Sequence, residues 1–108
     1  MKRNLVPRTV RDWIKECHLA ARKKGFWEKE RNVGEMLMLV VSELGEAIEA
    51  HRRSHFGMEQ KDTFEDEIAD TAIRLFDLCG GLGIDLGKQM EWKISFNKRR
   101  KKRHGKAY

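Results

Sequence analysis

The residues of this chain best suited to chemistry are two pairs of acids. Glu43 and Glu46 lie three residues apart, and Glu67 and Asp70 repeat that spacing. On a helix, residues three apart share one face, about a turn from each other. An apolar residue directly follows the first acid of each pair, which places the acids beside a buried stripe. One such pair is usually a solvated face with salt bridges, whereas for two pairs beside core residues a solvated face and a binding site are equally good interpretations.

The two pairs are expected to face each other across a helical hairpin. Two helices joined by a short loop normally pack antiparallel, and four facing carboxylates repel one another unless a cation lies among them. They offer only oxygen ligands, which suit Mg²⁺ or Mn²⁺ better than zinc or copper. Because Mg²⁺ keeps several waters and binds the phosphates of substrates, this pattern indicates a nucleoside triphosphate as the partner.

Four segments carry the helical spacing of apolar residues. They span about residues 10–24, 33–53, 62–79 and 86–100. Asn32 and Asp85 are predicted to cap the second and fourth segments. Glycines are predicted to end two of the segments. Gly25 ends the first, and the third ends at Gly80, Gly81 and Gly83. The chain is therefore predicted to be all-α, a four-helix antiparallel bundle.

Length and charge divide the chain into a near-neutral body and a basic end. The 108 residues suit one domain with a thin core, which association with another copy would help to complete. The formal charge is +6, yet seven Lys and Arg and no acid lie in residues 98–106, which leaves −1 for the rest. We therefore predict a helical domain at 1–97 and a basic tail at 98–108. Such a tail attracts polyanions, so the alternative function is a small helical module that binds nucleic acid through it.

Cysteine usage and hydropathy bear on the location of the protein. Cys17 and Cys79 belong to no CxxC motif and lie in apolar helical patterns, which is typical of reduced, buried thiols. No apolar run approaches the roughly 20 residues needed to span a bilayer. Residues 1–10 lack the apolar core of a signal peptide. A cytoplasmic protein with no membrane partner is expected.

The acid pairs also belong to a longer ordered pattern. The motif ExxE, followed after about twenty residues by ExxD, resembles that of the MazG-like, all-α nucleotide pyrophosphohydrolases. Residues 93–100, KISFNKRR, are similar to that family's K-x-x-x-N-x-x-R element, and residues 104–106, HGK, are similar to the ending of its small members. Residues 25–27, GFW, and 31–35, RNVGE, are similar to the lead-in to its acidic helix. The resemblance covers most of the chain, from about residue 13 to the end.

The resemblance implies a reaction and assigns roles to residues. The metal ligands would be Glu43, Glu46, Glu67 and Asp70, with Mg²⁺ as the cofactor and Mn²⁺ as a substitute. Lys93 and Asn97 would contact the phosphates or sugar and take part in catalysis, and Arg100 would add charge opposite the pyrophosphate leaving group. A water activated by the metal would attack a phosphoryl group, converting an NTP or dNTP to NMP or dNMP plus pyrophosphate. A carboxylate that is not fully engaged with metal could accept the water's proton, and Glu46 is the candidate. The implied enzyme is a nucleotide pyrophosphatase, a hydrolase of phosphoanhydride bonds. The resemblance, together with the thin core, also implies a homodimer or homotetramer.

Trp27 and the neighbouring Phe26 have two interpretations. They follow Gly25 in a predicted loop, where an aromatic ring can stack on a nucleobase and so bind substrate. The same ring can instead close the core of the bundle, which is the commoner role of a loop aromatic. Both interpretations stay open at the level of sequence.

Overall fold

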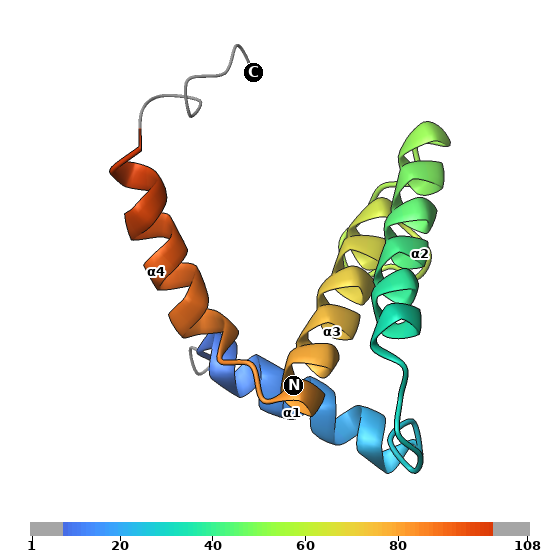
Figure 1. The fold of residues 1–108 in the computed structure, drawn as a ribbon. Coiled ribbons are helices and arrows are strands. Elements are labelled where there is room, and N and C mark those ends of the chain that lie inside the picture. Colours follow the sequence, from blue (N-terminus) through green and yellow to red (C-terminus); the bar gives the residue numbers. More distant parts are fainter. Residues whose placement is uncertain (1–7, 101–108) are drawn as a thin grey trace.

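The computed structural model describes residues 8–100, and its regular elements over that range are all helices (Figure 1). The four helices are α1 (Val10–Lys23), α2 (Val33–Arg52), α3 (Phe64–Leu82) and α4 (Leu86–Lys98). No β-strand occurs between residues 8 and 100. The all-α prediction is therefore confirmed, and the predicted boundaries differ from these by three residues at most.

Each helix begins at a polar side chain that accepts a hydrogen bond from a backbone N–H of the first turn. The four N-cap residues are Thr9, Asn32, Thr63 and Asp85. The Asp12 side chain also accepts from the Thr9 backbone, which completes a capping box. The predicted caps at Asn32 and Asp85 are confirmed, and these local contacts explain where the helices start.

The third helix continues past the point where the sequence predicts its end. Gly80 and Gly81 lie inside α3, and only Gly83, with φ of 68° in the left-handed region, ends it. A Cβ at Gly80 would lie 2.5 Å from the Cβ of His18, and a Cβ at Gly81 would overlap the ring of Trp27. The prediction that Gly80 and Gly81 end the helix is wrong, because their missing side chains serve close packing instead.

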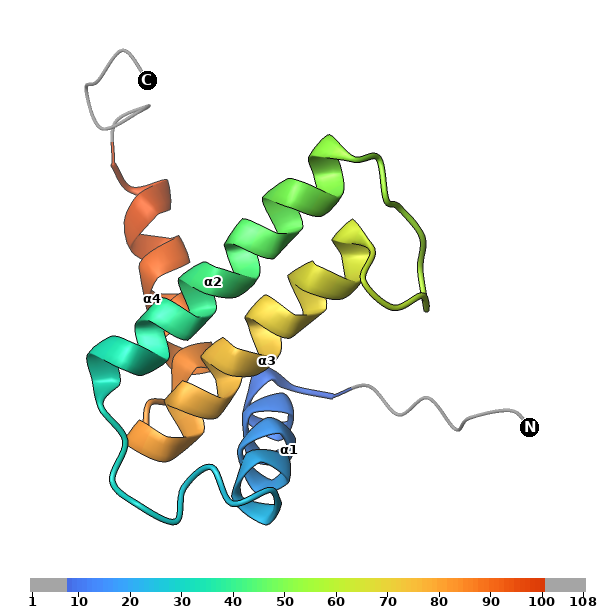
Figure 2. The ribbon, with the colours of Figure 1, turned by 90° about the vertical axis from the view of Figure 1, so that its right-hand side faces the viewer.

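Two helices form a hairpin, a third packs across one of them, and the fourth packs against the third. Helices α2 and α3 run antiparallel and make the most extensive helix–helix contact, while α1 packs across α3 (Figure 2). Helix α4 contacts α1 and diverges from the α2–α3 hairpin (Figure 1). The four helices of the predicted bundle are present, but within one chain α4 does not lie along the hairpin.

The core is thin, as the chain length predicts. Its buried apolar residues are Ile14, Cys17, Met36, Ala47, Ala50, Leu78 and Cys79. No large side chain in residues 8–100 is completely buried, and large apolar side chains of α2 such as Val41 and Ile48 are more than half exposed. Both cysteines are free and buried, which confirms that prediction. None of the described helices combines the length and the apolar character needed to cross a membrane.

Candidate functional site

The α2–α3 hairpin brings acids from both predicted pairs together. Glu43, Glu46 and Glu67 each offer a carboxylate oxygen, and these three atoms lie within 4.8 Å of one another. We call these three residues the acid cluster. Asp70 lies beside the cluster rather than in it. Burial raises the pKa of its carboxyl, and the nearby charges of Asp66 and Glu43 raise it further.

Glu67 is the most deeply placed member of the acid cluster. Only 6% of the residue is exposed, and its Oε2 atom is buried without a hydrogen-bond partner in the described chain. Burial, then a hydrogen bond to Glu46 and the charges of Glu46, Asp70 and Glu43, raise the pKa of Glu67 to about 7. A buried polar atom without a partner is costly, so this oxygen has the surroundings that suit a metal ligand.

A second acidic group overlaps the cluster at the start of α3. Asp62, Asp66 and Glu67 offer oxygens within the same 4.8 Å limit. Two of the carboxylates already have local roles, because Asp66 accepts a hydrogen bond from the backbone of Asp62 at 2.8 Å and Lys61 lies 3.8 Å from Asp62. Exposed acids near a helix N-terminus are also stabilised by the helix dipole. The acid cluster is therefore the better candidate metal site.

Glu43 has a cationic partner that the sequence analysis did not predict. Arg74, on α3, donates from Nε to Glu43 Oε1 at 2.8 Å. The Glu43 side chain is 11% exposed, whereas that of Arg74 is 41% exposed. The guanidinium thus reaches from the solvent side to the edge of the acid cluster and balances part of its charge.

A hollow of about 570 Å³ adjoins the acid cluster. Glu43, Asp70 and Arg74 form its wall on the hairpin, and Phe26 and Arg31 line it from the segment between α1 and α2. Residues of α1 close the remaining side. A pocket of several hundred cubic ångströms with an aromatic ring and a few charged groups has the size and character of a small-molecule site.

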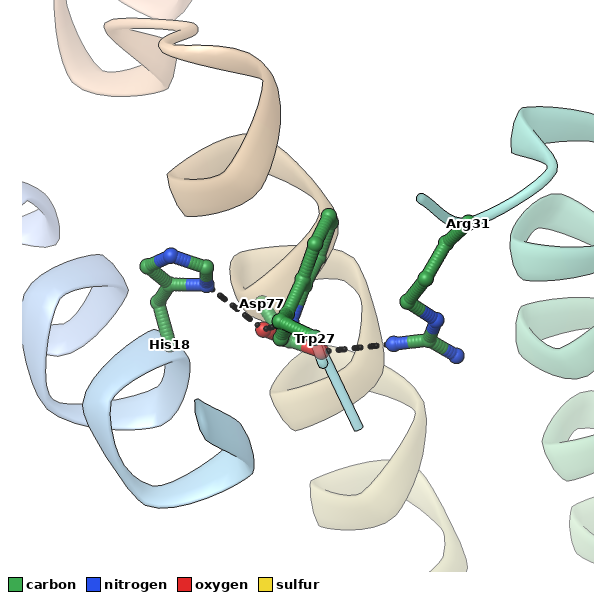
Figure 3. A network of polar contacts seen from close by, with 4 residues as sticks. All are labelled: His18, Trp27, Arg31 and Asp77. Carbon is green, nitrogen blue, oxygen red and sulfur yellow. Dashed lines mark hydrogen bonds and ion pairs between the residues drawn. The ribbon is translucent and has the colours of Figure 1, made fainter. Parts of the chain in front are cut away.

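Asp77, which also lines the hollow, is the centre of a second polar network (Figure 3). Its Oδ1 lies 2.9 Å from His18 Nδ1 and accepts from Trp27 Nε1 at 2.8 Å, while its Oδ2 lies 3.3 Å from Arg31 Nη1. These donors come from α1 and from the α1–α2 segment, so one buried carboxylate ties both to α3. The network also fixes Arg31 at the rim of the hollow.

Trp27 lies in this network and not among the residues that line the hollow. Its ring sits against Gly81 and makes an edge contact with His18, with 5.0 Å between the ring centroids. This placement agrees with the interpretation of Trp27 as a loop aromatic that closes the helix packing. The aromatic ring that lines the hollow is that of Phe26, and the assignment of Trp27 to substrate binding stays a prediction.

The predicted residues of the last helix are not brought to the acid cluster within one chain. Lys93, Asn97 and Arg100 are exposed, on or just after α4, which diverges from the hairpin (Figure 1). Lys93 Nζ lies 5.0 Å and the Arg100 guanidinium 5.5 Å from the ring centroid of Phe96. The HGK element at 104–106 and most of the predicted basic tail at 98–108 lie outside the described residues.

Comparison with known proteins adds no relative. No family model matches the chain, no curated protein matches it, and no solved structure matches it.

Three residues of the site, Arg31, Arg74 and Asp77, were not assigned to it from the sequence. Arg74 and Asp77 could have been found from the sequence. They continue the spacing of Glu67 and Asp70, at steps of four and three residues along α3. Such steps keep residues on one helix face, so Arg74 and Asp77 extend the acidic face. Nothing comparable marks Arg31, because the partner that holds it lies 46 residues away.

Proposed function

We propose that this protein is a Mg²⁺-dependent nucleoside triphosphate pyrophosphohydrolase that converts an NTP or dNTP to NMP or dNMP and pyrophosphate. The buried, unpartnered oxygen of Glu67 among other carboxylates carries the proposal. A metal-binding acid cluster beside a hollow with cationic and aromatic residues suits a phosphorylated, base-containing substrate. The ordered sequence pattern that resembles MazG-like enzymes supports the same reaction.

The acid cluster fits a hard divalent cation. It offers oxygen ligands only, which favours Mg²⁺ or Mn²⁺, and Glu67 Oε2 has no competing partner in the described chain. Glu43, Glu46 and Glu67 would hold the ion, with Asp70 at the border of the site. When bound, Mg²⁺ neutralises phosphate charge and lowers the pKa of a coordinated water.

The chain's own residues would handle the proton and the substrate. Glu46 is exposed on the open side of the acid cluster, while Glu67 lies beneath it. An accessible carboxylate next to a buried one is suited to accept a proton from the attacking water. Phe26, which is 57% exposed at the hollow, would stack on the base.

We also propose that the active form is a homodimer or homotetramer. The half-exposed apolar side chains of α2 support this, because a soluble chain rarely leaves so wide an apolar face uncovered. Association would also offer a route by which Lys93, Asn97 and Arg100 of a neighbouring copy approach the acids, which their own α4 does not do. The proposed substrate and cofactor are both abundant in the cytoplasm, the location expected from the sequence.

The test is hydrolysis of a panel of nucleoside triphosphates, with products resolved by ion-exchange chromatography. We expect monophosphate and pyrophosphate with Mg²⁺ and no product with EDTA. A Glu67→Gln variant should be inactive, whereas Glu35→Gln, which removes an exposed acid in the first turn of α2, should retain activity. If no nucleotide is hydrolysed by the folded protein, the proposal is wrong, and salt-dependent nucleic-acid binding becomes the next measurement.

A further inference from the structure

Two arginines face the hollow, and each is held by a buried carboxylate. Arg31 lies 3.3 Å from Asp77, and Arg74 lies 2.8 Å from Glu43. Both arginines line the hollow, together with Phe26. Guanidinium groups bind phosphate oxygens through fixed, paired N–H donors, so two of them that line one hollow are suited to bind one polyanion.

The two carboxylates that hold these arginines differ in what else they can bind. Asp77 receives three donors, from His18, Trp27 and Arg31, and lies outside the acid cluster. A divalent ion at the acid cluster would therefore not compete with Arg31 for Asp77. Glu43 belongs to the acid cluster, so a divalent ion and Arg74 attract the same carboxylate.

We propose, building on the proposed function, that Arg31 and Arg74 bind the phosphates of the substrate, and that cation binding at Glu43 frees Arg74 to do so. The positive charge of Arg74, 2.8 Å from Glu43 Oε1, opposes a second cation at that carboxylate. Once a divalent ion neutralises the charge of Glu43, the guanidinium of Arg74 can bind the substrate phosphates in the hollow that it already lines. Arg31 keeps its position before and after the ion binds, because its ion pair with Asp77 is unaffected.

This division of roles predicts opposite effects of one substitution on two ligands. Loss of Arg74 removes a competitor of the metal and a ligand of the phosphate, so metal binding strengthens while phosphate binding weakens. Loss of Arg31 weakens phosphate binding alone. If either arginine were merely structural, its loss would not change the affinities for metal and phosphate in these different ways.

The experiment measures both ligands on the full chain without relying on turnover. Mn²⁺ binding is followed by electron paramagnetic resonance, and binding of inorganic pyrophosphate at saturating Mg²⁺ by calorimetry. For Arg74→Gln we expect Mn²⁺ affinity to rise by about threefold and pyrophosphate affinity to fall by about tenfold. For Arg31→Gln we expect about the same tenfold loss for pyrophosphate and unchanged Mn²⁺ binding.

Two further variants keep the outcome interpretable. Arg53→Gln removes an arginine from an exposed ion pair with Glu49, away from the hollow, and should change neither affinity. Arg74→Lys keeps the charge and should return both affinities towards wild type, which excludes misfolding as the cause of the Arg74→Gln result.

Weaker or unchanged Mn²⁺ binding in Arg74→Gln, or undiminished pyrophosphate binding in both glutamine variants, would overturn this inference while leaving the proposed function standing. Absence of Mn²⁺ binding by the wild-type protein would instead overturn the proposed function itself.

Discussion

Glu67 and Asp77 are two buried carboxylates on the same helix, and their surroundings are opposite in kind. They are 6% and 8% exposed, so burial alone does not distinguish them. Asp77 is surrounded by donors from His18, Trp27 and Arg31 (Figure 3). Glu67 is surrounded by acids and keeps one oxygen without a partner.

The comparison separates a structural carboxylate from one that is suited to bind a cation. The donors around Asp77 satisfy its charge, and they join α1 and the α1–α2 segment to α3. The acids around Glu67 penalise its charged form and raise its pKa to about 7. Protonation of Glu67 or a bound cation relieves the repulsion in that cluster of like charges. Substitutions at Glu67 and Asp77 should therefore differ in their effects on catalysis, stability and metal binding.

The largest expected difference is in catalysis. Glu67→Gln should lower kcat/KM for nucleotide hydrolysis by at least about a hundredfold, because even partners outside the ligand shell contribute up to that factor. Asp77→Asn should lower it less, since this residue acts only through Arg31. Steady-state assays at saturating Mg²⁺ compare the two, and equal losses would contradict the assignment of separate roles.

Folding stability should show the reverse order. Asp77→Asn should lower the free energy of unfolding by about 3 kcal/mol, because it leaves a partly buried arginine without its countercharge. Glu67→Gln should leave stability unchanged or raise it, since the amide removes a charge that the site disfavours. Urea denaturation without divalent ions measures both, and a larger loss for Glu67→Gln than for Asp77→Asn would refute the comparison.

Mg²⁺ should stabilise the fold through the acid cluster alone. A ligand at about one hundred times its dissociation constant adds about 2.7 kcal/mol to the free energy of unfolding. We expect this gain in the wild type and in Asp77→Asn, and expect it to be absent in Glu67→Gln. Thermal unfolding with Mg²⁺ and with EDTA measures it. A full gain in Glu67→Gln would place the ion elsewhere.

The smallest expected effect is the change in the free energy of unfolding per pH unit. The pKa of Glu67 is about 7 in the folded chain against an ordinary value of 4.5, so between these values the folded state holds one more proton than the unfolded state. Stability in EDTA should therefore fall as pH rises from about 4.5 to 7, by at most about 1.4 kcal/mol per pH unit. Glu67→Gln should remove this contribution. Urea midpoints across that range test it, and a slope unchanged by the substitution would show that other groups cause it.

Much of the hairpin that carries the acid cluster could be predicted from sequence, because its signals are local. The spacing of Glu43, Glu46 and Glu67 and the cap at Asn32 depend on neighbours within a few residues or on one short loop. Contacts with distant parts of the chain do not change such local signals. The meeting of the two acid pairs needed only the antiparallel packing of consecutive helices.

The remaining features depend on contacts between distant segments. Gly80 and Gly81 look like helix ends, yet His18 and Trp27 pack against them and the helix continues. The partner of Arg31 lies across the fold, and no periodicity points to it. The direction of α4 depends on its packing rather than on its own sequence. Tertiary contacts of this kind override local preference.

The most direct test of the central claim is the position of a bound cation. A crystal grown with Mn²⁺ gives an anomalous difference map that locates the ion without assumptions about activity. We predict a peak among the carboxylates of Glu43, Glu46 and Glu67, with Asp77 still held by His18, Trp27 and Arg31. A peak elsewhere on the chain, or no peak at the acid cluster at Mn²⁺ concentrations that saturate hydrolysis, would contradict the account.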